Sequence, residues 1–127
     1  MNKRQVVILS RVVSVAYLAV ISYLCFARFN SLHSIGGQDK VVHFIMFFPY
    51  SFLVYGSLGK RVESGWRSLF QIILIFLSGC VVAALTEIVQ IYIPYRGGDF
   101  LDFRADILSI GISSLIVFII VICQRKS

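Results

Sequence analysis

The sequence predicts an all-α, polytopic membrane protein, a bundle of four transmembrane helices with both termini on the cytoplasmic side. The 127 residues are 58% hydrophobic and only 14% charged. Their mean hydropathy of +0.87 lies far above that of ordinary globular domains. Four apolar segments each approach or exceed the roughly 20 residues that a helix needs to cross the hydrocarbon core. We expect one domain over residues 1–127, because the chain is too short for a second.

The first segment, 6–26, contains Arg11 as its only charge. A cleaved signal peptide is the alternative interpretation, because Lys3 and Arg4 precede an apolar run and Cys25-Phe26-Ala27 resembles a small-residue cleavage site. The run is longer than the apolar part of most signal peptides, and it includes a charge. We therefore expect it to be retained as a membrane helix.

The second segment, 41–58, has His43 near its start and Pro49 in its middle. Proline has no N–H for the carbonyl of Ile45, so we expect a kink that neighbouring helices stabilise by satisfying the freed group. The third segment, 69–93, lacks Lys and Arg but contains Glu87 and Gln90 near its end. Those two side chains are three residues apart and share a helix face.

The fourth helix is expected over 100–123. The preceding Pro94-Tyr95-Arg96-Gly97-Gly98 must form a turn, because proline cannot continue a helix and glycine permits positive φ. Asp99 then occupies the N-cap position, with Asp102 three residues later. Asp106 continues the same stripe toward the membrane, followed by Ser109 and Ser113, so this helix is expected to have a polar face.

Basic residues indicate the orientation. One side carries Lys3, Arg4, Arg11, Lys60, Arg61, Arg67, Arg125 and Lys126, and the other carries Arg28, Lys40, Arg96 and Arg104. The richer side should be cytoplasmic, which places both termini inside a bacterial cytoplasmic membrane. Because the basic residues are dispersed between apolar runs, nucleic-acid binding is not expected. The lipid bilayer is the expected partner.

Five of the six acidic residues fall on the expected outer side. Ionisable groups near lipid are costly, so such a group is by default a candidate functional site. Two helices begin there, and their positive dipole ends suit an anion such as a lipid phosphate. The candidate ligand-binding residues are Asp39, Lys40, His43, Glu87, Gln90, Arg96, Asp99, Asp102 and Asp106.

Structural roles compete with this interpretation. Helix capping explains Asp39 and Asp99, and in part Asp102. Gln90 could make an interhelical hydrogen bond, and Glu87 an ion pair with Arg96.

The strongest functional candidates are His43, Glu87 and Asp106, with Arg96 as their counter-charge. No spacing is diagnostic of a metal, so we expect no cofactor, although oxygen-rich sites suit magnesium or calcium. The three cysteines show no metal-ligand spacing either.

Residues 39–111 resemble the VanZ-like family of small bacterial membrane proteins. The resemblance comprises Asp39-Lys40-x-x-His43-Phe44, then Glu87-x-x-Gln90, and then Arg96, Asp99, Asp102 and Asp106. Many members have Asn at the position of Asp106 and Gly at that of Ser109, so this chain carries more negative charge. The family takes its name from teicoplanin-type glycopeptide resistance, so the resemblance implies a cell-envelope role without a settled reaction.

Three functions fit these expectations. The first is an envelope protein whose outward polar pocket binds a phosphorylated lipid, a cell-wall precursor or the lipid-bearing antibiotic, with Arg96 as anion ligand. The second is an enzyme acting on such a lipid, with His43, Glu87 and Asp106 as catalytic residues in acid–base or metal-assisted chemistry. Histidine suits this because its ordinary pKa is about 6.5. The third is a small cation- or proton-coupled transporter.

Overall fold

The computed structural model describes residues 1–26, 38–58, 65–92 and 100–126. Within these ranges the regular structure is entirely α-helical. The helices are α1 (Lys3–Phe26), α2 (Gln38–Phe47), α3 (Tyr50–Leu58), α4 (Gly65–Ile91) and α5 (Phe100–Lys126).

Four stretches of this structure are long and apolar enough to cross a membrane: Lys3–Leu24, Val41–Leu58, Gly65–Ile91 and Phe100–Lys126. The second of them consists of α2 and α3 together. The prediction of an all-helical protein with four spans is therefore confirmed. At about 1.5 Å per residue, the 27 residues of α4 or α5 extend roughly 40 Å, more than the thickness of the hydrocarbon core.

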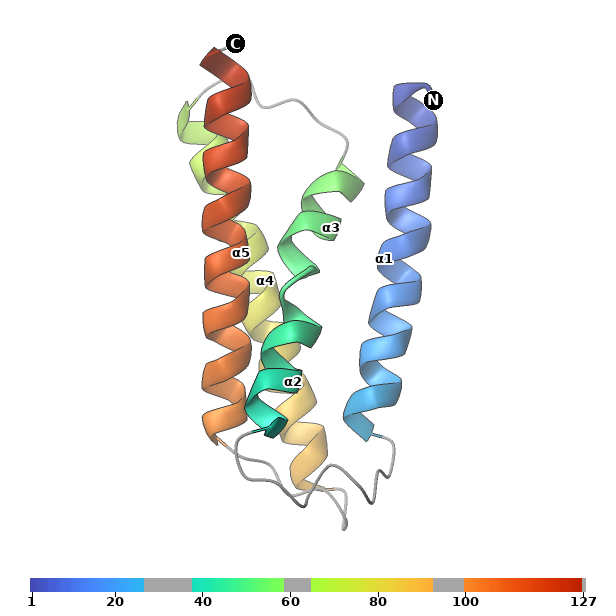
Figure 1. Ribbon diagram of the computed structural model, residues 1–127, viewed down its shortest axis with the longest axis vertical. Coiled ribbons are helices and arrows are strands. Elements are labelled where there is room, and N and C mark those ends of the chain that lie inside the picture. The colour runs from blue at the N-terminus through green and yellow to red at the C-terminus, as the bar shows by residue number, and fades with distance from the viewer. Residues whose placement is uncertain (27–37, 59–64, 93–99, 127) are drawn as a thin grey trace.

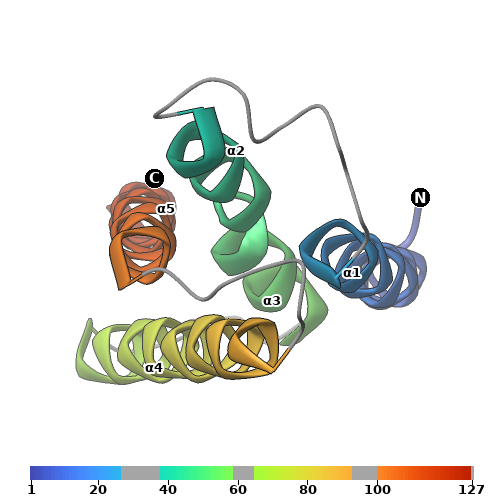
Figure 2. The same cartoon turned by 90° about the horizontal axis from the view of Figure 1, so that it is seen from below.

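The α2–α3 span lies at the centre of the bundle, between α5 on one side and α1 on the other (Figures 1 and 2). Helix α4 packs along α5, and α1 packs mainly on α3. Both chain termini lie at the same end of the bundle (Figure 1). At the opposite end α1 and α4 finish while α2 and α5 begin.

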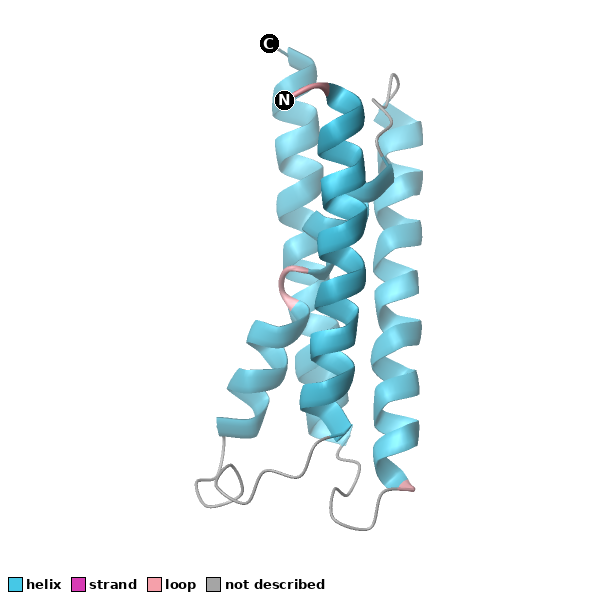
Figure 3. Ribbon diagram, turned by 90° about the vertical axis from the view of Figure 1, so that its right-hand side faces the viewer, coloured by secondary structure: helices cyan, strands magenta, loops and turns pink. Residues whose placement is uncertain are grey.

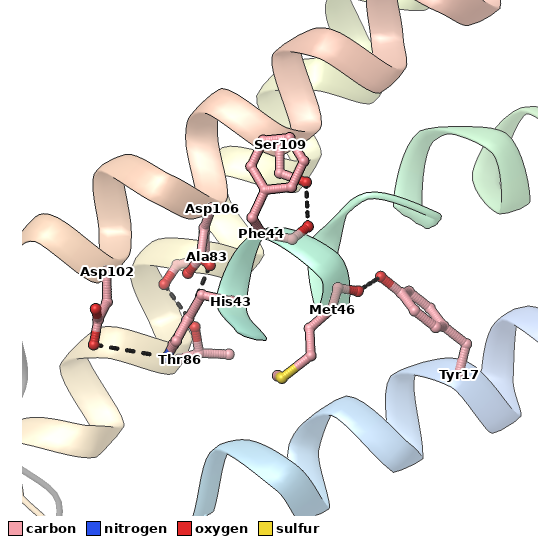
Figure 4. Close-up of polar contacts among 9 residues, drawn as sticks. All are labelled: Tyr17, His43, Phe44, Met46, Ala83, Thr86, Asp102, Asp106 and Ser109. Carbon is pink, nitrogen blue, oxygen red and sulfur yellow. Dashed lines mark hydrogen bonds and ion pairs between the residues drawn. The ribbon is translucent and has the colours of Figure 1, made fainter. Parts of the chain in front are cut away.

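The second span is interrupted at Phe48 and Pro49, which form a turn between α2 and α3 (Figure 3). The amide of Phe48 still donates to the carbonyl of Phe44, at 3.1 Å. Side chains of other helices supply further donors beside the break. The hydroxyl of Tyr17 on α1 donates to the carbonyl of Met46, and that of Ser109 on α5 donates to the carbonyl of Phe44 (Figure 4). The expected kink is thus a full break, and hydroxyl groups of α1 and α5 donate to the carbonyls on either side of that of Ile45, the group that Pro49 frees.

Small residues hold the helices close together. A Cβ on Gly79 of α4 would lie 2.7 Å from Cγ2 of Ile110 on α5 and 3.1 Å from Cε1 of Tyr50 on α3. Serines bridge other pairs of helices. The hydroxyl oxygens of Ser51 on α3 and Ser114 on α5 are 2.8 Å apart, a hydrogen-bond distance. Such packing is the usual means by which helices associate in lipid.

The outer surface of the bundle is rich in large apolar side chains on all four spans. In water such a surface would be an aggregation hazard, but against lipid tails it carries no penalty. Helix α1 is the most exposed, because it contacts the rest of the bundle mainly through α3. The arrangement is that of a membrane protein.

Candidate functional site

The candidate site lies toward the end of the bundle where α2 and α5 begin and α4 finishes. His43 is in α2, Glu87 in α4, and Asp102 and Asp106 in α5. We call these four side chains the polar centre. Asp102 and Asp106 are four residues apart and share one face of α5, so both turn toward His43 (Figure 4). Three helices that are distant in sequence therefore contribute to one group.

His43 lies between two carboxylates. Its Nδ1 is 3.0 Å from Oδ1 of Asp106, a hydrogen-bond distance. With Asp106 ionised, Nδ1 must carry the proton and donate it, because a carboxylate can only accept. The other ring nitrogen, Nε2, is 3.7 Å from Oδ2 of Asp102, which is too long for a hydrogen bond but close enough for attraction when the ring is charged.

The polar centre is almost entirely removed from solvent. Asp106 is 0% exposed, His43 6% and Glu87 7%. One ligand-type atom from each of these three residues lies within 4.8 Å of the others. Among the residues that the structure describes, the second carboxylate oxygen of Asp106, Oδ2, is buried and has no hydrogen-bond partner. A buried acceptor without a hydrogen-bond donor is energetically costly, so Oδ2 is suited to bind a proton, a cation or a donor group of a ligand.

The sequence-predicted residues divide into two groups. His43, Glu87, Asp102 and Asp106 come together in the polar centre, and Gln90 is buried on the same helix as Glu87. The remaining candidates lie outside what the structure describes. This holds for the whole of Arg96 and Asp99, and for the side chains of Asp39 and Lys40. The anion role of Arg96 and its pairing with Glu87 stay predictions.

The stripe of polar residues on α5 extends inward from Asp106. Ser109 and Ser113 are both fully buried, as the expected polar face requires. The hydroxyl oxygen of Ser113 lies 3.0 Å from that of Ser51 and 3.0 Å from the carbonyl oxygen of Ile110, and its one proton is donated to either of them. These hydroxyls satisfy one another and nearby carbonyls, so they hold α3 against α5.

Sequence reasoning missed Ser51 and the donor role of Tyr17. A signal for Ser51 existed, because residues 43, 47 and 51 follow a four-residue spacing along one helix face. Pro49 obscured that signal, since it made a continuous face uncertain. The contact of Tyr17 with the Met46 carbonyl joins segments 29 residues apart, and no local pattern indicates it.

The comparisons with known proteins return no match, whether to a family model, to a curated protein or to a solved structure. A function must therefore be argued from the polar centre itself.

Proposed function

We propose that this chain is a VanZ-like integral membrane protein of the bacterial cytoplasmic membrane, with both termini in the cytoplasm. Its polar centre then belongs to an outward-facing site for a phosphorylated lipid or a lipid-linked cell-wall precursor. One observation carries the proposal: His43, Glu87 and Asp106, from three different helices, are buried together inside an apolar bundle. A membrane protein retains such costly groups where they bind or transfer something.

Each part of the site has a chemical role in this proposal. The carboxylates of Asp102 and Asp106 accept hydrogen bonds from hydroxyl or amino groups of a headgroup, since ionised carboxylates are strong acceptors. Helices α2 and α5 both begin at this end, and their positive dipole ends favour a phosphate. Arg96 and Lys40 supply the positive charge that a phosphate needs beside so many carboxylates.

Mass spectrometry of lipids that co-purify with the protein tests this function. We expect the wild-type protein to retain a phosphorylated lipid, and His43→Gln and Arg96→Ala each to lower its occupancy at least fivefold. Arg125→Ala is the matched control, because it removes an arginine from the opposite end of α5. Equal lipid occupancy in all four proteins, at equal expression, would contradict the proposal.

The same variants distinguish a lipid from a lipid-bearing antibiotic as the ligand. Cells expressing wild type, Arg96→Ala or Arg125→Ala are compared for susceptibility to a teicoplanin-type glycopeptide. A lowered susceptibility that depends on Arg96 indicates that the site acts in resistance. Unchanged susceptibility together with retained lipid limits the function to the lipid.

A second candidate function is acid–base chemistry on such a lipid. The 3.0 Å contact between His43 Nδ1 and Asp106 Oδ1 favours it, because a carboxylate in this position fixes the tautomer of a catalytic histidine. Incubation of the purified protein with a phosphorylated lipid and analysis of the products distinguishes the two. An enzyme converts the lipid with a rate that falls at least a hundredfold in His43→Gln, whereas a binding protein returns it unchanged.

A further inference from the structure

The geometry points to a divalent-cation site formed by His43, Glu87 and Asp106, for an ion of the zinc or manganese class. The site deepens the proposed function and shares the polar centre with it. Two separate observations support it: the convergence of three ligand-type side chains, and the buried, unfilled oxygen of Asp106.

The ligand atoms are close enough for a single ion. One nitrogen or oxygen from each side chain lies within 4.8 Å of the other two. Opposite ligands on one octahedral ion with bonds of about 2.1 Å are separated by about 4.2 Å, and adjacent ones by about 3.0 Å. The three ligand atoms therefore need to come only slightly closer together to bind one ion.

The second observation is independent of the clustering. Asp106 is 0% exposed, and its Oδ1 already accepts from His43. Its Oδ2 is buried with no hydrogen-bond partner among the described residues. A cation bound between Nδ1 of His43 and Oδ2 satisfies this oxygen and takes the place of the ring proton that Nδ1 otherwise donates to Oδ1.

Charge supports the same assignment. With a neutral imidazole and two ionised carboxylates, the three side chains carry a formal charge of −2, which is expensive to bury. A divalent cation cancels that charge. An imidazole beside two carboxylates is a mixed nitrogen and oxygen ligand set, which favours zinc or manganese over calcium.

The cation also accounts for the conflict between a carboxylate-rich site and a phosphorylated lipid. An ion bound to the carboxylates attracts the phosphate that they would otherwise repel. With the ion on Nδ1 of His43, the ring proton is on Nε2, and Asp102, whose Oδ2 is 3.7 Å from Nε2, acts as a positioning residue for the imidazole.

Metal binding to the full-length protein in detergent is the test. The protein is stripped with a chelator and dialysed, and Zn²⁺ or Mn²⁺ is titrated with calorimetry and elemental analysis. We expect one ion per chain for the wild type. Glu87→Gln and Asp106→Asn, which keep size and hydrogen-bonding capacity, should each lower the affinity at least tenfold. Glu63→Gln is the control, because Glu63 belongs to the segment between α3 and α4.

The affinity should also fall as pH decreases, since protons compete with the metal for imidazole and carboxylate. The site is wrong if the wild type binds no ion, or if both variants bind as tightly as Glu63→Gln. Binding of Ca²⁺ or Mg²⁺ alone also overturns the assignment. If one of the two variants does not fold, the metal affinity of the other variant is the test, and a thermal shift of the wild type by Zn²⁺ provides a second readout.

The cation site and the lipid function can fail separately. A protein that retains lipid but binds no metal refutes only the cation site, and a protein that binds metal but retains no lipid refutes only the lipid function.

Discussion

At the level of single residues, the hydrogen-bonded pair of His43 and Asp106 determines which substitutions in the polar centre lower the stability of the protein. Asp106 is fully buried and His43 almost fully, and each is a hydrogen-bond partner of the other. Truncation of one partner therefore costs more than the bond itself is worth, because the other remains buried with an unmet polar group. Replacement of Asp106 by a neutral side chain of the same shape that still accepts a hydrogen bond avoids this penalty.

The first prediction compares two substitutions of one residue. Asp106→Ala should lower the free energy of unfolding by about 2 kcal/mol, because Nδ1 of His43 loses its acceptor inside the bundle. Asp106→Asn should remain within about 1 kcal/mol of the wild type, since its amide oxygen still accepts from Nδ1. Reversible unfolding in mixed micelles, with a chelator present throughout, measures both. Equal losses for Ala and Asn would show that the hydrogen bond to His43 contributes nothing.

At the level of helices, the broken second span depends on donors from its neighbours. Tyr17→Phe keeps the aromatic ring but removes the hydroxyl that donates to the Met46 carbonyl next to the break. We expect a loss of about 1 kcal/mol in unfolding free energy, the usual contribution of one hydrogen bond. Tyr92→Phe is the matched control, because Tyr92 is 82% exposed. An identical stability for the two variants would show that the break needs no donor from α1.

A second prediction at this scale concerns the contact of α4 with α3 and α5. Gly79→Ala places a methyl group 2.7 Å from Cγ2 of Ile110, so either the Ile110 side chain or the helices must shift. Overpacking of this kind costs about 1–3 kcal/mol, more than the helix propensity gained from alanine.

Gly111→Ala is the control for that variant. Its added methyl group lies 3.4 Å from Cε2 of Phe76, close to ordinary contact. We expect Gly79→Ala to lower the thermal midpoint in detergent and Gly111→Ala to leave it unchanged or slightly higher. The reverse order would mean that α4 and α5 are not in close contact at Gly79.

The sequence predicts the helices well, because hydropathy and length alone define a membrane span. It also places His43 and Asp106 at the same end of the bundle, since each stands near the start of a helix that runs from that end. It does not predict their contact across 63 residues, because helix order around a bundle depends on packing that no local pattern records. Pro49 illustrates the same limit: its position predicts a disturbance, but the donors that stabilise the break come from α1 and α5.

For the whole molecule, the position of the termini relates the uneven distribution of Lys and Arg to the orientation in the membrane. Both termini lie at one end of the bundle, and the polar centre lies toward the other (Figure 1). Eight of the 12 Lys and Arg residues belong to segments at the end with the termini, which the positive-inside tendency assigns to the cytoplasm. The polar centre should therefore face outward.

Reporter fusions test this orientation. We expect a fluorescent protein fused to the C-terminus to be bright, because it folds in the cytoplasm, and alkaline phosphatase fused there to be inactive. Alkaline phosphatase inserted after Phe26, in the segment between α1 and α2, should be active. Replacement of Lys60, Arg61 and Arg67 by Gln removes three positive charges from the side that we expect to be cytoplasmic, and should lower the fraction of chains in that orientation. An active phosphatase at the C-terminus would place the polar centre on the cytoplasmic side, where its ligand would have to be a cytoplasmic headgroup.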